Sequence, residues 1–340
     1  MRVYVGMSGG VDSSLTAALL VEQGYDVTGV YMKNWTQDLP GMKCPWADDL
    51  ADAKRVAVQL GIDFKVFDFE KEYKHKVVDY MIDEYKRGRT PNPDIMCNQE
   101  VKFKLFLEAA LEDGADTIAT GHYARVEEGV LKQAVDTNKD QTYFLYRVTG
   151  EALAKTLFPL GQYTKPQVRA MATERGLSTA AKKDSQGICF VGKIGIREFL
   201  SEYVQQTPGD IIDTMTEKVI GRHDGAIFYT LGQRHGLDVG GGLPYYVVGK
   251  DMDKNEVYVT TDLNDNTLWK NEIHLQELHW INQPPVNAEY IIRVRHRAPL
   301  VRATLADSVL SLANPERAVT AGQSVVIYDG ETCLGGGIVA

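Results

Sequence analysis

Short apolar runs alternate with longer amphipathic stretches over roughly the first third of the chain. The runs predict strands at 2–7, 27–32, 64–67 and 117–120, and the stretches predict helices at 13–23, 48–60, 72–86 and 103–112. Strands that alternate with helices are typical of βαβ units, so we expect a doubly wound parallel sheet. Ligands bind such sheets at the carboxyl ends of the strands.

The pattern changes in the second half. A further helix is predicted at 164–176, followed by a polar loop at 182–193. Beyond about Pro208 short β runs separated by turn residues predominate, at 245–248, 257–260, 290–295, 301–305 and 324–328. The chain has 340 residues, enough for two or three domains. We therefore predict an α/β domain over 1–195, a small α+β central domain over 196–270 and a C-terminal β-barrel over 271–340.

Charge and cysteine content exclude several classes of protein. The 37 basic and 46 acidic side chains give a formal charge of −9, which argues against a general nucleic-acid coat but allows a local basic face. Asp12 interrupts the first apolar stretch, and no window resembles a membrane span, so neither a signal peptide nor membrane association is expected. Four cysteines without a C-x-x-C pair predict a reduced, cytoplasmic protein.

A glycine-rich loop follows the first predicted strand. Its residues are Gly6, Met7, Ser8, Gly9, Gly10, Val11, Asp12, Ser13 and Ser14. Two glycines permit close backbone approach, and the following helix N-terminus offers amide groups and a partial positive charge, which together suit a phosphate. The loop lacks the Gly-Lys-Ser/Thr ending of the P-loop and the G-x-G-x-x-G dinucleotide fingerprint. The alternative interpretation is an ordinary strand-to-helix turn with a serine cap.

Two cysteines lie in polar segments. Cys97 follows Asn92-Pro93-Asp94, and we expect a helix to start near Glu100, which would place the thiol just before a helix N-terminus and lower its pKa. Asp94 is close enough in sequence to transfer a proton. Cys189 lies in a Gly-containing segment after Lys182 and Lys183, which could stabilise a thiolate.

The remaining two cysteines carry less signal. We expect Cys333, in an apparent terminal β-hairpin, to be a buried structural residue. Cys44 is equally compatible with a structural or a chemical role.

These motifs carry a resemblance. The loop resembles the signature of the ATP pyrophosphatase superfamily, which cleaves ATP to AMP and pyrophosphate. Together with further segments it resembles the bacterial-type tRNA-specific 2-thiouridylases along essentially the whole chain. Those segments are Asn92-Pro93-Asp94 with Cys97-Asn98, Thr120-Gly121-His122-Tyr123, Asp140-Gln141-Thr142-Tyr143, 183–190, 229–234 and 333–337.

The resemblance implies a PP-loop fold (adenine nucleotide alpha hydrolase-like) and a tRNA-uridine 2-sulfurtransferase activity. ATP, bound by residues 6–13, Met32 and Gly121, would adenylate the 2-oxygen of the wobble uridine, with magnesium offsetting the phosphate charge and no residue assigned as a metal ligand. Cys189 would carry sulfur as a persulfide from a sulfur-relay protein. Cys97 would be the second nucleophile, forming a transient disulfide with Cys189, and Asp94 the acid/base partner. We expect a monomer.

Contacts to tRNA are expected at several places. By resemblance, Asn92, Pro93 and Asp94 border the target base, which must leave its stack to be reached. His122, Asp140, Gln141, Thr142 and Gln323 also match contact positions. Arg293, Arg295, Arg297 and Arg302 form a basic stripe, and Val294 between the first two is also an expected contact. The first three arginines would share a face if they alternate along one strand. The alternative for this stripe is a solvated β face.

Two other functions fit part of the sequence. A superfamily synthetase that adenylates a small molecule would explain the loop but not two cysteines in polar segments. A non-catalytic RNA-binding protein with a vestigial nucleotide fold would not explain why Asp12, Asp94 and both cysteines are present together.

Overall fold

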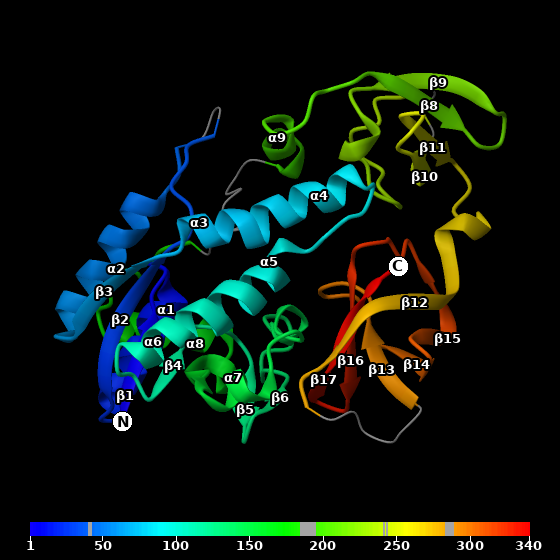
Figure 1. The fold of residues 1–340 in the computed structure, drawn as a ribbon. Coiled ribbons are helices and arrows are strands. Elements are labelled where there is room, and N and C mark those ends of the chain that lie inside the picture. Colours follow the sequence, from blue (N-terminus) through cyan, green and yellow to red (C-terminus); the bar gives the residue numbers. More distant parts are fainter. Residues whose placement is uncertain (40–42, 184–194, 241, 243, 283–288) are drawn as a thin grey trace.

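A five-stranded parallel sheet organises the N-terminal part of the protein (Figure 1). In the computed structural model, which describes residues 1–39, 43–183, 195–240, 242, 244–282 and 289–340, the strand order is β3-β2-β1-β4-β7. Their bounds are Arg2–Gly6 (β1), Asp26–Lys33 (β2), Asp63–Asp68 (β3), Thr117–Ala119 (β4) and Thr156–Leu157 (β7). All pairings are parallel, which confirms the predicted doubly wound sheet.

Three helices share one buried cluster with this sheet. They are α1 (Val11–Glu22), α2 (Trp46–Leu60) and α8 (Lys165–Glu174), and α1 packs against the other two. α2 ends at Gly61, which takes the left-handed conformation that terminates many helices. α8 begins with a capping box between Thr164 and Gln167. Each of the three was predicted to within a few residues.

A long helical stretch runs without interruption from Pro93 to Glu112, as α5 (Pro93–Met96), a π-helical segment (Cys97–Leu105) and α6 (Phe106–Glu112). The prediction of a start near Glu100 was wrong. Asn92 caps the first turn, because its side chain accepts hydrogen bonds from the amides of Asp94 and Ile95, and Pro93 suits the first helical position. The predicted helix at 72–86 is likewise one helical stretch, formed by α3 (Glu70–Tyr73), a π-helical segment (Lys74–Asp79) and α4 (Tyr80–Lys86).

The central domain is a small sheet of order β10-β11-β8-β9 at the far end of α4 (Figure 1). Its elements are α9 (Ile196–Ser201), β8 (Gly209–Asp213), β9 (Lys218–His223), β10 (Tyr246–Asp251) and β11 (Glu256–Thr260). Val77 and Met81 share a buried cluster with Ile211 and Val257, so the helical stretch 70–86 joins this domain to the first.

The C-terminal domain is a barrel closed by β12, which pairs with both β15 and β17. Its strands are β12 (Trp269–Trp280), β13 (Glu289–Arg293), β14 (Val301–Ala306), β15 (Val309–Arg317), β16 (Ser324–Asp329) and β17 (Thr332–Val339). The hairpin of β5 (Arg125–Glu127) and β6 (Val130–Lys132) from the N-terminal domain adds to β17 through Lys132 and Thr332. α7 (Gly150–Ala154) packs against this hairpin.

Candidate active site

The nucleotide loop, residues 6–13, folds back on itself between β1 and α1. The Ser8 amide donates to Ser13 Oγ at 3.1 Å, and the hydroxyls of Ser13 and Ser14 donate to the Gly10 carbonyl at 3.2 and 2.8 Å. Gly9 has φ +73°, and a Cβ there would overlap the carbonyl oxygen of Asp49 on α2. Within the described part of the chain no side chain caps α1, so the first amides of this helix remain available to an anion.

The other residues expected to bind ATP surround this loop. A Cβ on Gly6 would lie 3.0 Å from Met32 Cε, and one on Gly121 would lie 2.8 Å from the Ser13 amide nitrogen. The carboxyl ends of β1, β2 and β4 therefore meet at the loop, as the topology predicts. Met7 and Val11 point into the core, so they offer backbone groups to a ligand.

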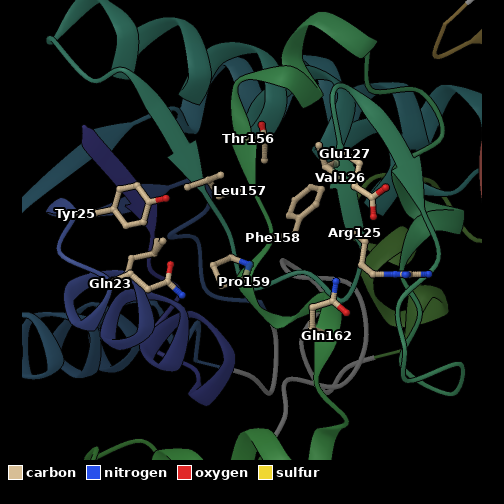
Figure 2. A pocket seen from close by; sticks show the side chains of 11 residues that line it. Gln23, Tyr25, Arg125, Val126, Glu127, Thr156, Leu157, Phe158, Pro159 and Gln162 are labelled. Atoms are coloured by element: carbon tan, nitrogen blue, oxygen red, sulfur yellow. The ribbon is translucent and has the colours of Figure 1, made fainter.

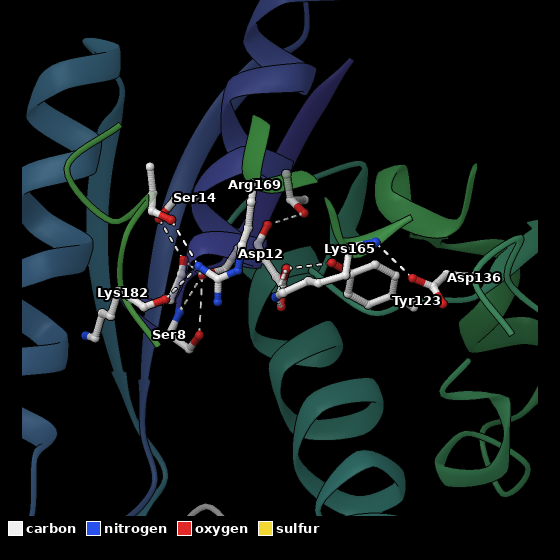
Figure 3. Close-up of polar contacts among 12 residues, drawn as sticks. Ser8, Asp12, Ser14, Tyr123, Asp136, Lys165, Arg169 and Lys182 are labelled. Atoms are coloured by element: carbon white, nitrogen blue, oxygen red, sulfur yellow. Dashed lines mark hydrogen bonds and ion pairs between the residues drawn. The ribbon is translucent and has the colours of Figure 1, made fainter. Parts of the chain in front are cut away.

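Sequence reasoning missed two partners of Asp12. Lys165 Nζ lies 2.8 Å from both Asp12 carboxylate oxygens, and the Tyr123 hydroxyl donates to Asp12 Oδ1 at 2.8 Å (Figure 3). The Lys165 amide donates to Asp136, which fixes the start of α8. Lys165 and Asp12 lie 153 positions apart, so no local spacing reveals the pair; it follows from the packing of α8 on α1. The arrangement places an ammonium–carboxylate ion pair beside the loop.

Lys182 does not lie free to stabilise a thiolate, as its position near Cys189 suggested. Its Nζ contacts Asp49 Oδ1 at 2.7 Å and Asp52 Oδ2 at 2.6 Å, both on α2. Burial lowers the pKa of Lys182, but the two carboxylates outweigh it and the net shift is upward. Cys189 itself lies outside the described residues, so the expected pairing with Cys97 is not tested.

Cys97 occupies the fifth position of the 93–112 helical stretch rather than a site before it. Its side chain is 2% exposed and packs in a cluster with Trp35, Cys44 and Val101. Asp94 lies one turn earlier, and the Cys97 amide donates to its carbonyl. Burial raises the pKa of Asp94, with Lys102 opposing, so this carboxyl holds its proton to a higher pH than a solvated one. A proton donor thus stands one turn from a thiol.

The remaining described cysteines are buried. Among the residues that the structure covers, Cys44 and Cys333 are free thiols. Burial raises the pKa of both Cys44 and Cys333. The Cys44 thiol donates to the Trp35 carbonyl at 3.6 Å, and Cys333 lies in the core shared by the barrel and the first domain. The geometry of both suits packing.

Two expected tRNA contacts, Asp140 and Thr142, are instead buried between domains. Asp140 is 2% exposed; it accepts from the Ala134 amide at 3.0 Å and the Thr142 hydroxyl at 2.8 Å, and Arg293 Nη1 lies 3.5 Å away. Thr142 is also 3.3 Å from the Tyr328 hydroxyl of the barrel. Both residues join the first domain to the barrel, and their contact with tRNA stays a prediction.

Two further expected contacts are also engaged. The Gln141 side chain accepts from the Tyr123 amide at 2.8 Å. His122 is buried against Phe103 and Phe158, which lowers its pKa, and its Nδ1 lies 2.7 Å from the Thr120 hydroxyl.

The basic stripe does not share the face of one strand. β13 ends at Arg293, and Arg295 and Arg297 lie in the following bend and turn, where Arg297 has φ +63°. Arg293 is 12% exposed and faces Asp140 and the Tyr328 ring, while Arg295 is exposed and donates to the Arg317 carbonyl at 3.2 Å. The prediction of alternation was wrong because the turn ends the strand earlier. The neighbouring positions are Val294, which is buried, Arg302, which is exposed on β14, and Gln323, which is partly exposed before β16.

Comparison with known proteins identifies the family. Family models described as tRNA methyl transferase HUP domain, tRNA methyl transferase PRC-barrel domain and aminomethyltransferase beta-barrel domain match residues 1–193, 197–261 and 270–339. The tRNA-specific 2-thiouridylase MnmA of Bacillus subtilis is 48% identical over 99% of this chain and 94% of its own length, and MnmA 2 of Geobacillus kaustophilus is 49% identical with the same coverage. The chain belongs to the tRNA-specific 2-thiouridylase family.

Among solved structures, a 4-thiouridine synthetase in complex with RNA and bound ATP is similar to this chain. The two are 17% identical with a TM-score of 0.40, over 59% of this chain and 50% of the synthetase. Within the thiouridylase chain, the ranges that the structure describes contain no group of three His, Cys, Asp or Glu side chains suited to a metal ion. None of the helices in those ranges is both long and apolar enough to cross a bilayer.

A separate cavity of about 210 Å³ lies away from the nucleotide loop (Figure 2). Gln23 and Tyr25, at the opposite end of α1, line it together with Arg125, Phe158 and Gln162. Because the loop lies at the first turn of α1, this cavity is not part of the nucleotide site.

Proposed function

We propose that the protein is an ATP-dependent tRNA-uridine 2-sulfurtransferase acting in the cytoplasm. The observation that carries the proposal is the uncapped start of α1 beside the Asp12–Lys165 pair, in a chain whose relatives are named as thiouridylases. The family models that match this chain are described differently, as domains of tRNA methyl transferases and of an aminomethyltransferase. The nucleotide loop and the Asp94–Cys97 turn supply what adenylation and sulfur transfer need.

The first step uses the nucleotide loop. The uracil 2-oxygen attacks the α-phosphorus of ATP, the bond to the bridging oxygen breaks, and pyrophosphate leaves. Amides of α1 hold the leaving phosphates, and Lys165 offsets their charge. Magnesium prefers oxygen ligands and takes one or two carboxylates beside phosphate oxygens, so Asp12, partly exposed at the loop, fits it. When bound, the ion would neutralise phosphate charge.

The second step uses the cysteines. The terminal sulfur of a Cys189 persulfide attacks the uracil C2, and AMP leaves. The Cys97 thiolate then attacks the Cys189 sulfur, the bond to the transferred sulfur breaks, and a Cys97–Cys189 disulfide forms, which an external thiol reduces. Asp94, with its raised pKa, holds the proton that these steps exchange. A persulfide-donating protein is required to reload Cys189.

The tRNA would approach from the side of Asn92, Pro93 and Asp94, which border the target base. Arg295 is exposed at the barrel surface and is suited to a phosphate. Arg293, Asp140 and Thr142 would act behind this surface by holding the barrel in place. One monomer contains all the residues assigned.

The test is mass spectrometry of nucleosides from tRNA incubated with the protein, ATP, magnesium and a persulfide source. We expect 2-thiouridine at the wobble position and one pyrophosphate for each sulfur transferred. An ATP analogue that resists cleavage between the α- and β-phosphates serves as the control and should give neither product. A methylated nucleoside, or 2-thiouridine formed equally well with the analogue, would contradict the proposal.

A further inference from the structure

The chain from Ala180 to Lys182 is held between two helices. On one side, the Arg169 guanidinium of α8 donates from Nη1 to the carbonyls of Ala180 and Lys182, each at 3.0 Å. On the other side, the Lys182 ammonium contacts Asp49 and Asp52 of α2 at 2.7 and 2.6 Å. Backbone and side chain of one residue are therefore fixed from opposite directions.

The same two helices touch the nucleotide loop. The Asp49 carbonyl packs against Gly9 so closely that a Cβ there would overlap it. One turn before Arg169 on α8, Lys165 binds both carboxylate oxygens of Asp12. Each helix thus joins the loop to the 180–182 segment within one turn of its own length.

Both helices are also anchored by buried apolar side chains. α2 is buried through Ala53, Val56 and Ala57, and α8 through Val168 and Ala172. Lys182, Asp49 and Asp52 are about one-quarter to one-third exposed, a setting in which an ion pair adds little to stability. A polar clamp that costs side-chain freedom and contributes little to the fold calls for another explanation.

We propose that Arg169 and Lys182 are positioning residues, which set the 180–182 segment in register with the nucleotide loop; Cys189 follows Lys182 seven positions later in the sequence. The inference rests on the proposed function for its catalytic consequence. A nucleotide that tightens the loop acts on Asp12 and Gly9, and through α8 and α2 on the carbonyl of Lys182 and its ammonium group. Sulfur delivery then depends on the clamp, whereas ATP binding does not.

The experiment compares Lys182→Gln and Arg169→Gln with two references. Lys182→Arg keeps the charge and the donors toward Asp49 and Asp52, and Lys54→Gln removes an exposed lysine from the same helix. We expect the two test variants to bind ATP and release pyrophosphate within about twofold of the parent. Single-turnover transfer of sulfur from loaded enzyme to tRNA should fall on the order of tenfold to a hundredfold, the cost of a misplaced reacting group. Lys182→Arg should recover most of the rate, and Lys54→Gln should match the parent.

A second measurement needs no thiolation. Amide hydrogen exchange of the peptide that contains residues 177–183 should slow when ATP binds to the parent, and should not respond to ATP in Lys182→Gln. If the parent shows this coupling but forms no thiouridine, the proposed function fails and the link between loop and clamp stands. Equal transfer rates in parent and variants, or an ATP response that survives the substitution, would overturn the inference.

Discussion

Gly9→Ala tests whether the nucleotide loop needs its glycine for backbone conformation, for close packing, or for both. Gly9 has φ +73°, where an alanine costs about 1–2 kcal/mol. The new Cβ would also overlap the Asp49 carbonyl oxygen and lie 3.0 Å from Asp49 Cα, and overpacking against backbone typically costs about 1–3 kcal/mol more. We therefore expect the free energy of unfolding to fall by roughly 2–5 kcal/mol.

Gly24→Ala is the matched control. Gly24 follows α1 with φ +81°, and nothing lies within 4 Å of a Cβ built there. It should lose only the conformational part, about 1–2 kcal/mol, and keep its ATP affinity. Urea denaturation followed by circular dichroism measures the first quantity and titration with ATP the second.

The difference between the two variants isolates the contact with Asp49. Gly9→Ala must displace the loop or α2, so we expect ATP affinity to fall about tenfold, which corresponds to about 1.4 kcal/mol of binding free energy. Should Gly9→Ala bind ATP as tightly as Gly24→Ala and unfold at the same urea concentration, the packing of Asp49 on the loop would have no role.

Three further predictions concern other parts of the site. Asp94→Asn should raise the free energy of unfolding at neutral pH and abolish sulfur transfer. Burial raises the pKa of Asp94 in the folded state, so the parent loses stability as the pH rises from the unfolded-state pKa to the folded-state pKa. Denaturation at pH 3, where Asp94 is protonated in both states, should show no such gain. Arg293→Met should lower the unfolding free energy by about 1–3 kcal/mol, since it leaves Asp140 buried without its cation, whereas Arg295→Ala should spare stability and flatten the salt dependence of tRNA binding by roughly one unit of slope. Cys44→Ser and Cys333→Ser should keep thiolation within a few fold, measured on tRNA nucleosides, and sulfur loading on either thiol would contradict the roles given to Cys97 and Cys189.

Local sequence signals predicted the turn between β1 and α1 because its parts are local. The turn between β1 and α1 needs glycine where the backbone is strained or crowded, and that requirement is written in consecutive residues. The Asn92-Pro93 pair is also a local signal, because it caps the helical stretch that contains Cys97. The prediction of a start near Glu100 did not use it. Partners supplied by packing, such as Lys165 for Asp12, leave no trace in spacing.

The barrel was harder to predict. β12 is mostly exposed over its first half, so it lacks the apolar alternation that marks a half-buried strand. The run at 290–295 did carry β-forming residues, yet the bend after Arg293 redirects the arginines that follow. Asp140 and Thr142 are buried because the barrel packs against the first domain. Their partners Arg293 and Tyr328 lie more than 150 positions away, so the sequence near position 140 does not predict this burial.

The seam between β6 and β17 bears on how the protein can be divided. Tyr143 and Tyr146, which precede α7, bond to Ser324 of β16 and share one core with Val326 and Tyr328. A fragment ending near residue 193 would keep the nucleotide loop but expose these rings and leave β6 without its neighbour, an unpaired edge of the kind that recruits other chains. One family model covers residues 1–193, yet we expect that this part does not fold alone. Truncated forms should therefore aggregate under conditions in which the intact chain stays in solution.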